Sequence, residues 1–189
     1  MLTTIPKSSG VTLIEMMIVL AIFAITLTFG VSSYRTWVQN TQIRNAAESI
    51  QNGIQRARAE AVKCNADVAF ILGPATSWRV VHAKDCGDVS ASGVAAGTTL
   101  ESRSSGEGSK NVTVSAAVDK DGNNATTITF SSLGTVADPA TALAQIDLTS
   151  SVASADLRNL RIAIGLGGNA RVCDPNLDPA TSTDPRRCY

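Results

Sequence analysis

The sequence predicts an α+β protein in which one long N-terminal helix, part transmembrane and part amphipathic, packs on antiparallel β-sheet. Three observations predict this class. Residues 11–31 are almost wholly apolar, and residues 32–64 continue with apolar side chains at helical spacing. Residues 65–189 consist of short β-rich runs separated by turn residues. A helix that precedes a series of antiparallel strands is typical of α+β domains.

The first ten residues, MLTTIPKSSG, are polar and carry one cation, Lys7. The apolar block that follows is long enough for a helix to cross a hydrocarbon core of about 30 Å. A secretory signal places its small-residue cleavage site after the apolar run, whereas here Gly10 precedes it. We therefore expect residues 1–10 to be a leader that is removed by a cut after Gly10, and the apolar block to stay on the mature chain.

One charged residue, Glu15, interrupts the apolar block. A carboxylate inside a membrane is costly and usually functional, with a partner that can be named. A cut after Gly10 places the new amino group on Val11, and an ammonium and a carboxylate of neighbouring helices could then neutralise each other. The alternative is a side chain that merely reaches back to the membrane surface.

Beyond the apolar block the helix is expected to continue to about residue 64, because no Pro interrupts residues 11–62. A helix of roughly fifty residues is about 75 Å long. Its second half should lay one apolar stripe on a sheet: Ile43, Ala46, Ala47, Ile50, Ile54, Ala57, Ala61 and Val62.

The head, residues 65–189, is expected to contain two hairpins and one further pair of strands joined by a turn. The hairpins join 67–72 to 77–83 and 157–164 to 169–173, with Gly-rich or Gly-Pro turns between. Residues 111–118 and 126–130 are β-rich on either side of a turn, and residues 137–155 fit an irregular insertion. The last sixteen residues should form a loop-like tail.

Four Cys residues in a chain that starts with a membrane-targeting segment predict two disulfides in an oxidising compartment. Four Cys allow three connectivities. We expect Cys64–Cys86, which would tie the helix end to the strand after the first turn. We also expect Cys173–Cys188, which would close the tail.

No catalytic constellation is apparent in the sequence. The single His, His82, lies in a predicted strand, and the Cys residues lack the paired spacing of a zinc site. We therefore predict no enzymatic activity, no cofactor and no bound metal.

The segment Ser9-Gly10-Val11-Thr12-Leu13-Ile14-Glu15 resembles the processing motif of type IV pilins and type II secretion pseudopilins. The resemblance implies that a prepilin peptidase cuts after Gly10 and N-methylates Val11, where the family usually has Phe. It implies that Glu15 guides assembly with other pilins or pseudopilins through the N-terminal helix. It also implies a pilin-like fold, a single inner-membrane pass with a cytoplasmic N-terminus, and a periplasmic head that later enters a pilus or pseudopilus.

Shorter and less specific similarities extend over the head. Residues 56–61, 129–134, 157–162 and 167–175 resemble the minor pilins FimT and FimU and the pseudopilin GspH. This resemblance implies a minor pilin at or near the tip of a type IV pilus that primes filament assembly. The alternative is the pseudopilin of a type II secretion system.

A further alternative is a tip subunit that binds DNA during natural transformation, as some FimT-like proteins do through a Gly-Arg-x-Arg motif. The matching region here, residues 168–171, contains only one Arg, and the formal net charge is zero. DNA binding is therefore not favoured. The arginines that could supply it are Arg158, Arg161, Arg171, Arg186 and Arg187.

Overall fold

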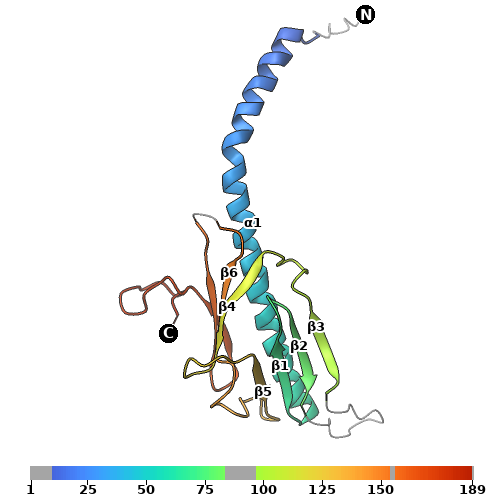
Figure 1. Ribbon diagram of the computed structural model, residues 1–189, viewed down its shortest axis with the longest axis vertical. Helices are drawn as coiled ribbons and strands as arrows, with labels where there is room; N and C mark the ends of the chain where they lie inside the picture. Colours follow the sequence, from blue (N-terminus) through green and yellow to red (C-terminus); the bar gives the residue numbers. More distant parts are fainter. Residues whose placement is uncertain (1–9, 84–96, 154–155, 189) are drawn as a thin grey trace, which may run out of the picture. The chain divides into compact units, whose positions relative to one another are not determined.

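The computed structural model describes residues 10–83, 97–153 and 156–188. The chain divides into two compact units, Met1–Trp37 and Val38–Tyr189. One helix and eight strands are found in the described residues (Figure 1). They are α1 (Leu13–Cys64), β1 (Val68–Leu72), β2 (Trp78–His82), β3 (Thr99–Arg103), β4 (Val112–Val118), β5 (Thr127–Phe130), β6 (Gln145–Ser150), β7 (Leu160–Ile164) and β8 (Ala170–Cys173).

Helix α1 confirms the long helix that the sequence predicts, and its C-terminal end is fixed by a recognisable cap. Asn65 adopts a left-handed conformation with φ of 49°. Its N–H donates to the carbonyl of Val62, and the N–H of Ala66 donates to the carbonyl of Ala61. These two bonds form a Schellman motif, which satisfies carbonyls that the last turn leaves unpaired and turns the chain towards β1.

The strands form two four-stranded antiparallel sheets, in the orders β3-β2-β1-β5 and β4-β6-β7-β8. Both predicted hairpins are confirmed. In β1 and β2, Val68 pairs with His82 and Leu72 with Trp78. In β7 and β8, Ile164 pairs with Ala170 across the glycine-rich turn.

The sequence interpretation was wrong about the middle of the head in two ways. Strands β4 and β5 follow each other in sequence but belong to different sheets, because β4 pairs with β6 and β5 with β1. Residues 137–155 are not wholly irregular, because they contain β6, an inner strand of its sheet. Ile146 and Leu148 alternate with polar residues along β6 and are fully buried. The polar edge strand β3 was not predicted.

Within the second unit, the predicted apolar stripe of α1 forms the centre of the core; of its members only Val62 is exposed. Gly53 lies on this face, where a Cβ atom would be 2.9 Å from the Phe70 ring and 3.0 Å from the Trp78 ring. The lack of a side chain there lets both rings approach the helix backbone. The Trp78 indole N–H donates to the Ser49 hydroxyl at 2.9 Å, which satisfies this buried donor.

A second close contact joins the two loops at the ends of β5 and β7. Gly168 has φ of 79°, and a Cβ atom on it would lie 2.6 Å from the carbonyl oxygen of Gly134. That same carbonyl accepts a hydrogen bond of 2.9 Å from Nε of Arg58. The arrangement fixes both loops on the helix.

We expect Gly168→Ala to lower the free energy of unfolding by about 2–5 kcal/mol, because a left-handed conformation and a steric overlap both apply. Gly122→Ala is the matched control, since Gly122 has φ of 86° but open space around it. The control should lose only about 1–2 kcal/mol. Urea unfolding of residues 38–189 measures both, and equal losses would contradict the predicted overlap.

Candidate functional site: the start of the helix and the closed tail

Helix α1 begins with a side-chain cap formed by two residues of the predicted processing motif. The backbone N–H of Glu15 donates to Oγ1 of Thr12 at 3.3 Å, and the N–H of Met16 donates to the Thr12 carbonyl at 3.2 Å. A Thr at the N-cap with Glu three residues later is a strong helix start signal. The carboxylate of Glu15 also lies in the first turn, where the helix dipole favours negative charge.

The predicted scissile bond between Gly10 and Val11 lies outside the helix. Both residues are exposed, and a Cβ atom placed on Gly10 would meet nothing within 4 Å. A peptidase can reach this bond without opening secondary structure. The absence of a side chain at residue 10 is therefore not required by the packing of the subunit itself.

The apolar side chains from Val11 to Leu27 are all exposed, and Leu13 is 80 % accessible. Among residues 10–83, 97–153 and 156–188, no helix meets the length and hydropathy needed to cross a bilayer.

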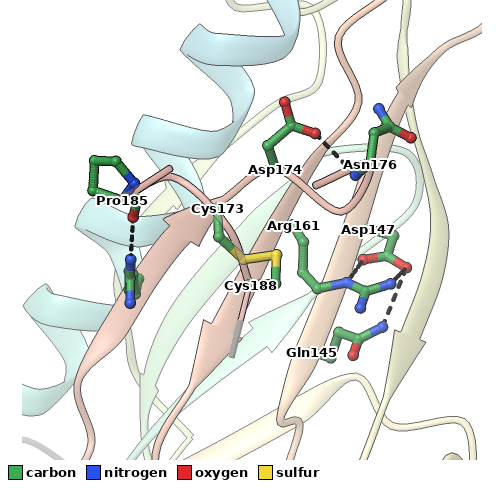
Figure 2. Close-up of a disulfide and its surroundings, with 9 residues drawn as sticks. Gln145, Asp147, Arg161, Cys173, Asp174, Asn176, Pro185 and Cys188 are labelled. Atoms are coloured by element: carbon green, nitrogen blue, oxygen red, sulfur yellow. Dashed lines mark hydrogen bonds and ion pairs between the residues drawn. A yellow bond between two sulfur atoms is a disulfide. The ribbon is translucent and has the colours of Figure 1, made fainter. Parts of the chain in front are cut away.

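The tail is closed by a disulfide between Cys173 and Cys188, as predicted (Figure 2). Between the two Cys residues the tail follows a wide loop, and no side chain from residue 174 to 187 is fully buried. Asp174 lies beside Arg187 in a short parallel bridge, and its N–H donates to the carbonyl of Arg186 at 2.7 Å. Cys64 is also disulfide-bonded, but its predicted partner Cys86 lies outside the described residues, so that pairing stays a prediction.

Replacing both Cys173 and Cys188 by Ser should lower the free energy of unfolding by about 3 kcal/mol, the chain-entropy value for a loop of this size. The tail buries too little apolar surface to hold itself in place. Urea unfolding of residues 38–189 would measure the loss, provided that the free energy of unfolding depends on urea concentration with the same slope in the variant and the wild type. An unchanged midpoint would show that the disulfide does not stabilise the head.

One buried cluster contains three residue types that can bind a metal ion. Ligand atoms of Glu60, Cys64 and His82 lie within 4.8 Å of one another. A metal needs the thiolate form of Cys, and the disulfide removes it. Glu60 is already paired with Lys63 at 3.1 Å. His82 is 1 % exposed, and its ring nitrogens find no partner in the described residues. Without Cys64, only Glu60 and His82 could supply ligands. A structural site needs four ligands, so we assign no metal here.

The arginines considered for DNA binding lie partly together on the outer face of the second sheet. Arg161 pairs with Cys173 and Arg171 with Ala163 in the ladder, which places both arginines on one face. The guanidinium of Arg171 donates to the carbonyl of Pro185, which brings the tail beside them. Arg158 lies at the start of this region, where its backbone N–H donates to the side chain of Asn40.

Two of these five arginines, Arg161 and Arg186, are paired with carboxylates. Arg161 makes two bonds to Asp147, at 2.6 Å and 2.9 Å (Figure 2), and this hydrogen bonding raises the pKa of Arg161. The side-chain hydrogen bond from Arg186 lowers the pKa of Asp184 to about 2, so this carboxylate keeps its charge beside Arg186 even at moderately acidic pH. Arg187 donates to the carbonyl of Ser182.

Sequence reasoning missed two residues that shape these sites. Thr12 could have been found, because Thr-x-x-Glu before an apolar run is the capping-box signature. Asp147 was missed because β6 was not predicted, and only the pairing of β6 with β7 places it opposite Arg161.

A capped apolar helix whose second half packs on two antiparallel sheets is the pilin-like α+β fold. A family profile described as the prokaryotic N-terminal methylation motif matches residues 5–31. A second profile, type II transport protein GspH, matches residues 46–168, more than half of the chain. The chain belongs to the GspH family and has the N-terminal methylation motif.

Two similar solved structures are crystal forms of the type IV minor pilin FimU of Pseudomonas aeruginosa, strain PAO1. They share 18 % and 20 % sequence identity with the chain, at TM-scores of 0.41 and 0.42. The matches cover 77 % and 81 % of this chain and 99 % of each FimU chain. No curated protein sequence matches the chain.

Proposed function

We propose that this protein is a minor pilin that enters a type IV pilus at or near its tip and primes filament assembly. A prepilin peptidase removes residues 1–10 and methylates Val11. Before assembly the subunit lies in the inner membrane, with residues 11–31 in the bilayer and the head in the periplasm. It then assembles with other pilins through its N-terminal helix.

The arrangement of Gly10, Val11 and Glu15 is the observation that carries this proposal. An exposed Gly-Val bond precedes a capped helix whose apolar side chains from Val11 to Leu27 are exposed. Such a surface needs lipid or neighbouring subunits. The methylation motif supports cleavage at this bond, and a carboxylate at the helix start supports pairing with the new amino group.

A type II secretion pseudopilin is the second candidate, favoured by the description of the family to which the chain belongs. Deletion of the gene in its own host separates the two. Surface pili counted by electron microscopy should fall if the protein primes a pilus, while secreted enzymes remain at their normal level. Normal pili with a loss of secretion would replace the first proposal by the second.

We expect residues 38–189 to bind duplex DNA weakly or not at all at physiological salt. Five arginines, from Arg158 to Arg187, share their region with five carboxylates: Asp147, Asp156, Asp174, Asp178 and Asp184. Strong DNA binding needs several uncompensated phosphate contacts, and each weakens with salt.

A band-shift titration at about 0.15 M salt, repeated at lower salt, measures this affinity. Arg171→Ala and the double variant Arg186→Ala/Arg187→Ala are the informative variants, and Arg79→Ala, on another sheet, is the control. Micromolar binding that is lost in the first two variants and kept in the third would make DNA capture the leading function.

A further inference from the structure

An exposed aromatic pair stands on α1 a short distance beyond the apolar block. Tyr34 is 64 % accessible and Trp37 is 62 % accessible. Their ring centroids are 5.9 Å apart, which fits residues three apart on one helix face. Arg35 between them is exposed as well. Large aromatic rings are rarely left this accessible on a water-facing helix unless something covers them.

The spacing along the helix indicates what covers them. The apolar block ends at Val31, and twenty residues of rise from Val11 span about 30 Å, the thickness of the hydrocarbon core. Tyr34 and Trp37 then lie about 5 Å and 9 Å further along. The headgroup layer is about 5–7 Å deep on each side. Helical side chains lean towards the N-terminus, so the Trp37 ring covers the preceding turn. The ring therefore lies at the depth of the headgroup layer.

The chemistry of the three side chains fits the same layer. Tyr and Trp combine an apolar ring with a polar group and collect at membrane–water interfaces. An arginine beside them can bind lipid phosphate while its stem stays against the apolar chains. A neighbouring apolar helix would cover the rings equally well but would offer nothing to a guanidinium group.

We propose that Tyr34, Arg35 and Trp37 form an aromatic anchor that binds the phospholipid headgroup layer and fixes the depth of the subunit in the membrane before assembly. This inference rests on the proposed membrane-inserted state of the precursor. Its occupant is lipid, and the anchor must leave the lipid when the subunit enters a filament.

The chain offers a direct optical test, because Trp37 and Trp78 are its two Trp residues. Trp78 is 5 % exposed within the core of the head and should be out of reach of lipid. The full chain is reconstituted into vesicles of phosphatidylcholine and phosphatidylglycerol. The lipids are brominated either near the carbonyl end or near the methyl end of the acyl chains, and Trp emission is recorded.

Bromines near the carbonyl end should quench emission at least about twofold more than bromines near the methyl end, since the ring belongs at headgroup level. Trp37→Phe should abolish this difference, and Trp78→Phe should keep it. Stronger quenching from the methyl end, or no quenching of vesicle-bound protein, would overturn the anchor. A Trp37 emission shift that occurs only in assembled filaments would assign the rings to a neighbouring subunit and also overturn it.

Flotation of the vesicles keeps this inference distinct from the function on which it rests. Protein that fails to float with the vesicles would overturn membrane insertion and the anchor with it. Protein that floats but is not quenched would overturn the anchor alone.

Discussion

Replacing Gly10 by Val should stop maturation almost completely, so that the precursor accumulates with its ten leader residues and does not enter filaments. A Cβ atom on Gly10 would touch nothing in the described part of the chain, so we expect the substitution to leave the fold intact and to act at the peptidase. Intact-mass measurement of protein purified from membranes reads the result. The wild-type chain should start at Val11 and carry the additional mass of one methyl group.

The matched control lies on the other side of the same bond. Val11→Phe introduces the residue that related proteins usually have there and should be cut as the wild type is. A wild-type mass that retains residues 1–10, or that lacks residues 11–31, would contradict the proposed cleavage. Normal cutting of Gly10→Val would show that the peptidase does not need a glycine.

Glu15→Ala should reduce incorporation into filaments by about tenfold or more, which corresponds to at least ~1.4 kcal/mol, with no loss of membrane insertion. The carboxylate is costly in the membrane and gains a cationic partner only when subunits meet. Membrane fractions report insertion, and sheared surface filaments report incorporation.

A second variant separates the charge of Glu15 from its place at the helix start. Gln at this position keeps the backbone N–H that donates to Thr12 and a polar side chain of similar size, but carries no charge. Glu15→Gln should therefore be as defective as Glu15→Ala if the ion pair matters. Thr12→Val, which removes the hydroxyl acceptor and keeps the carboxylate, should incorporate nearly normally. Normal filaments from Glu15→Gln would restore the simpler view that the side chain only reaches the membrane surface.

The long helix and the two hairpins could be predicted because their signals are local. The stripe from Ile43 to Ala61 repeats at helical spacing, and Gly73-Pro74 and Gly165–Gly168 mark tight turns between adjacent strands. Strand partners that are distant in sequence leave no such signal. Strand β5 follows β4 after a turn, yet it pairs with β1, because Phe130 and Ile128 are buried against the helix side of that sheet.

The candidate site residues also divide into those with a local signal in the sequence and those that depend on strand pairing. Gly10, Val11 and Glu15 were predicted from their positions around the apolar block and from the resemblance to the pilin processing motif, both of which are local in sequence, and their roles stay predictions. Whether the arginines form a cationic surface could not be predicted, because Asp147 compensates Arg161 only through the pairing of β6 with β7. The Cys173–Cys188 disulfide was predicted because the tail has too few apolar residues to fold by packing and needs a covalent closure.

The side-chain cap at the start of α1 bears on the order of events in the proposed biogenesis. If the chain is cut after Gly10, Thr12 and Glu15 both remain on it, and the bond between Gly10 and Val11 lies outside the helix they begin. Removal of the leader would then require no refolding of the helix start. In the proposed pathway a folded subunit could be stored in the membrane and made competent for polymerisation by one hydrolysis.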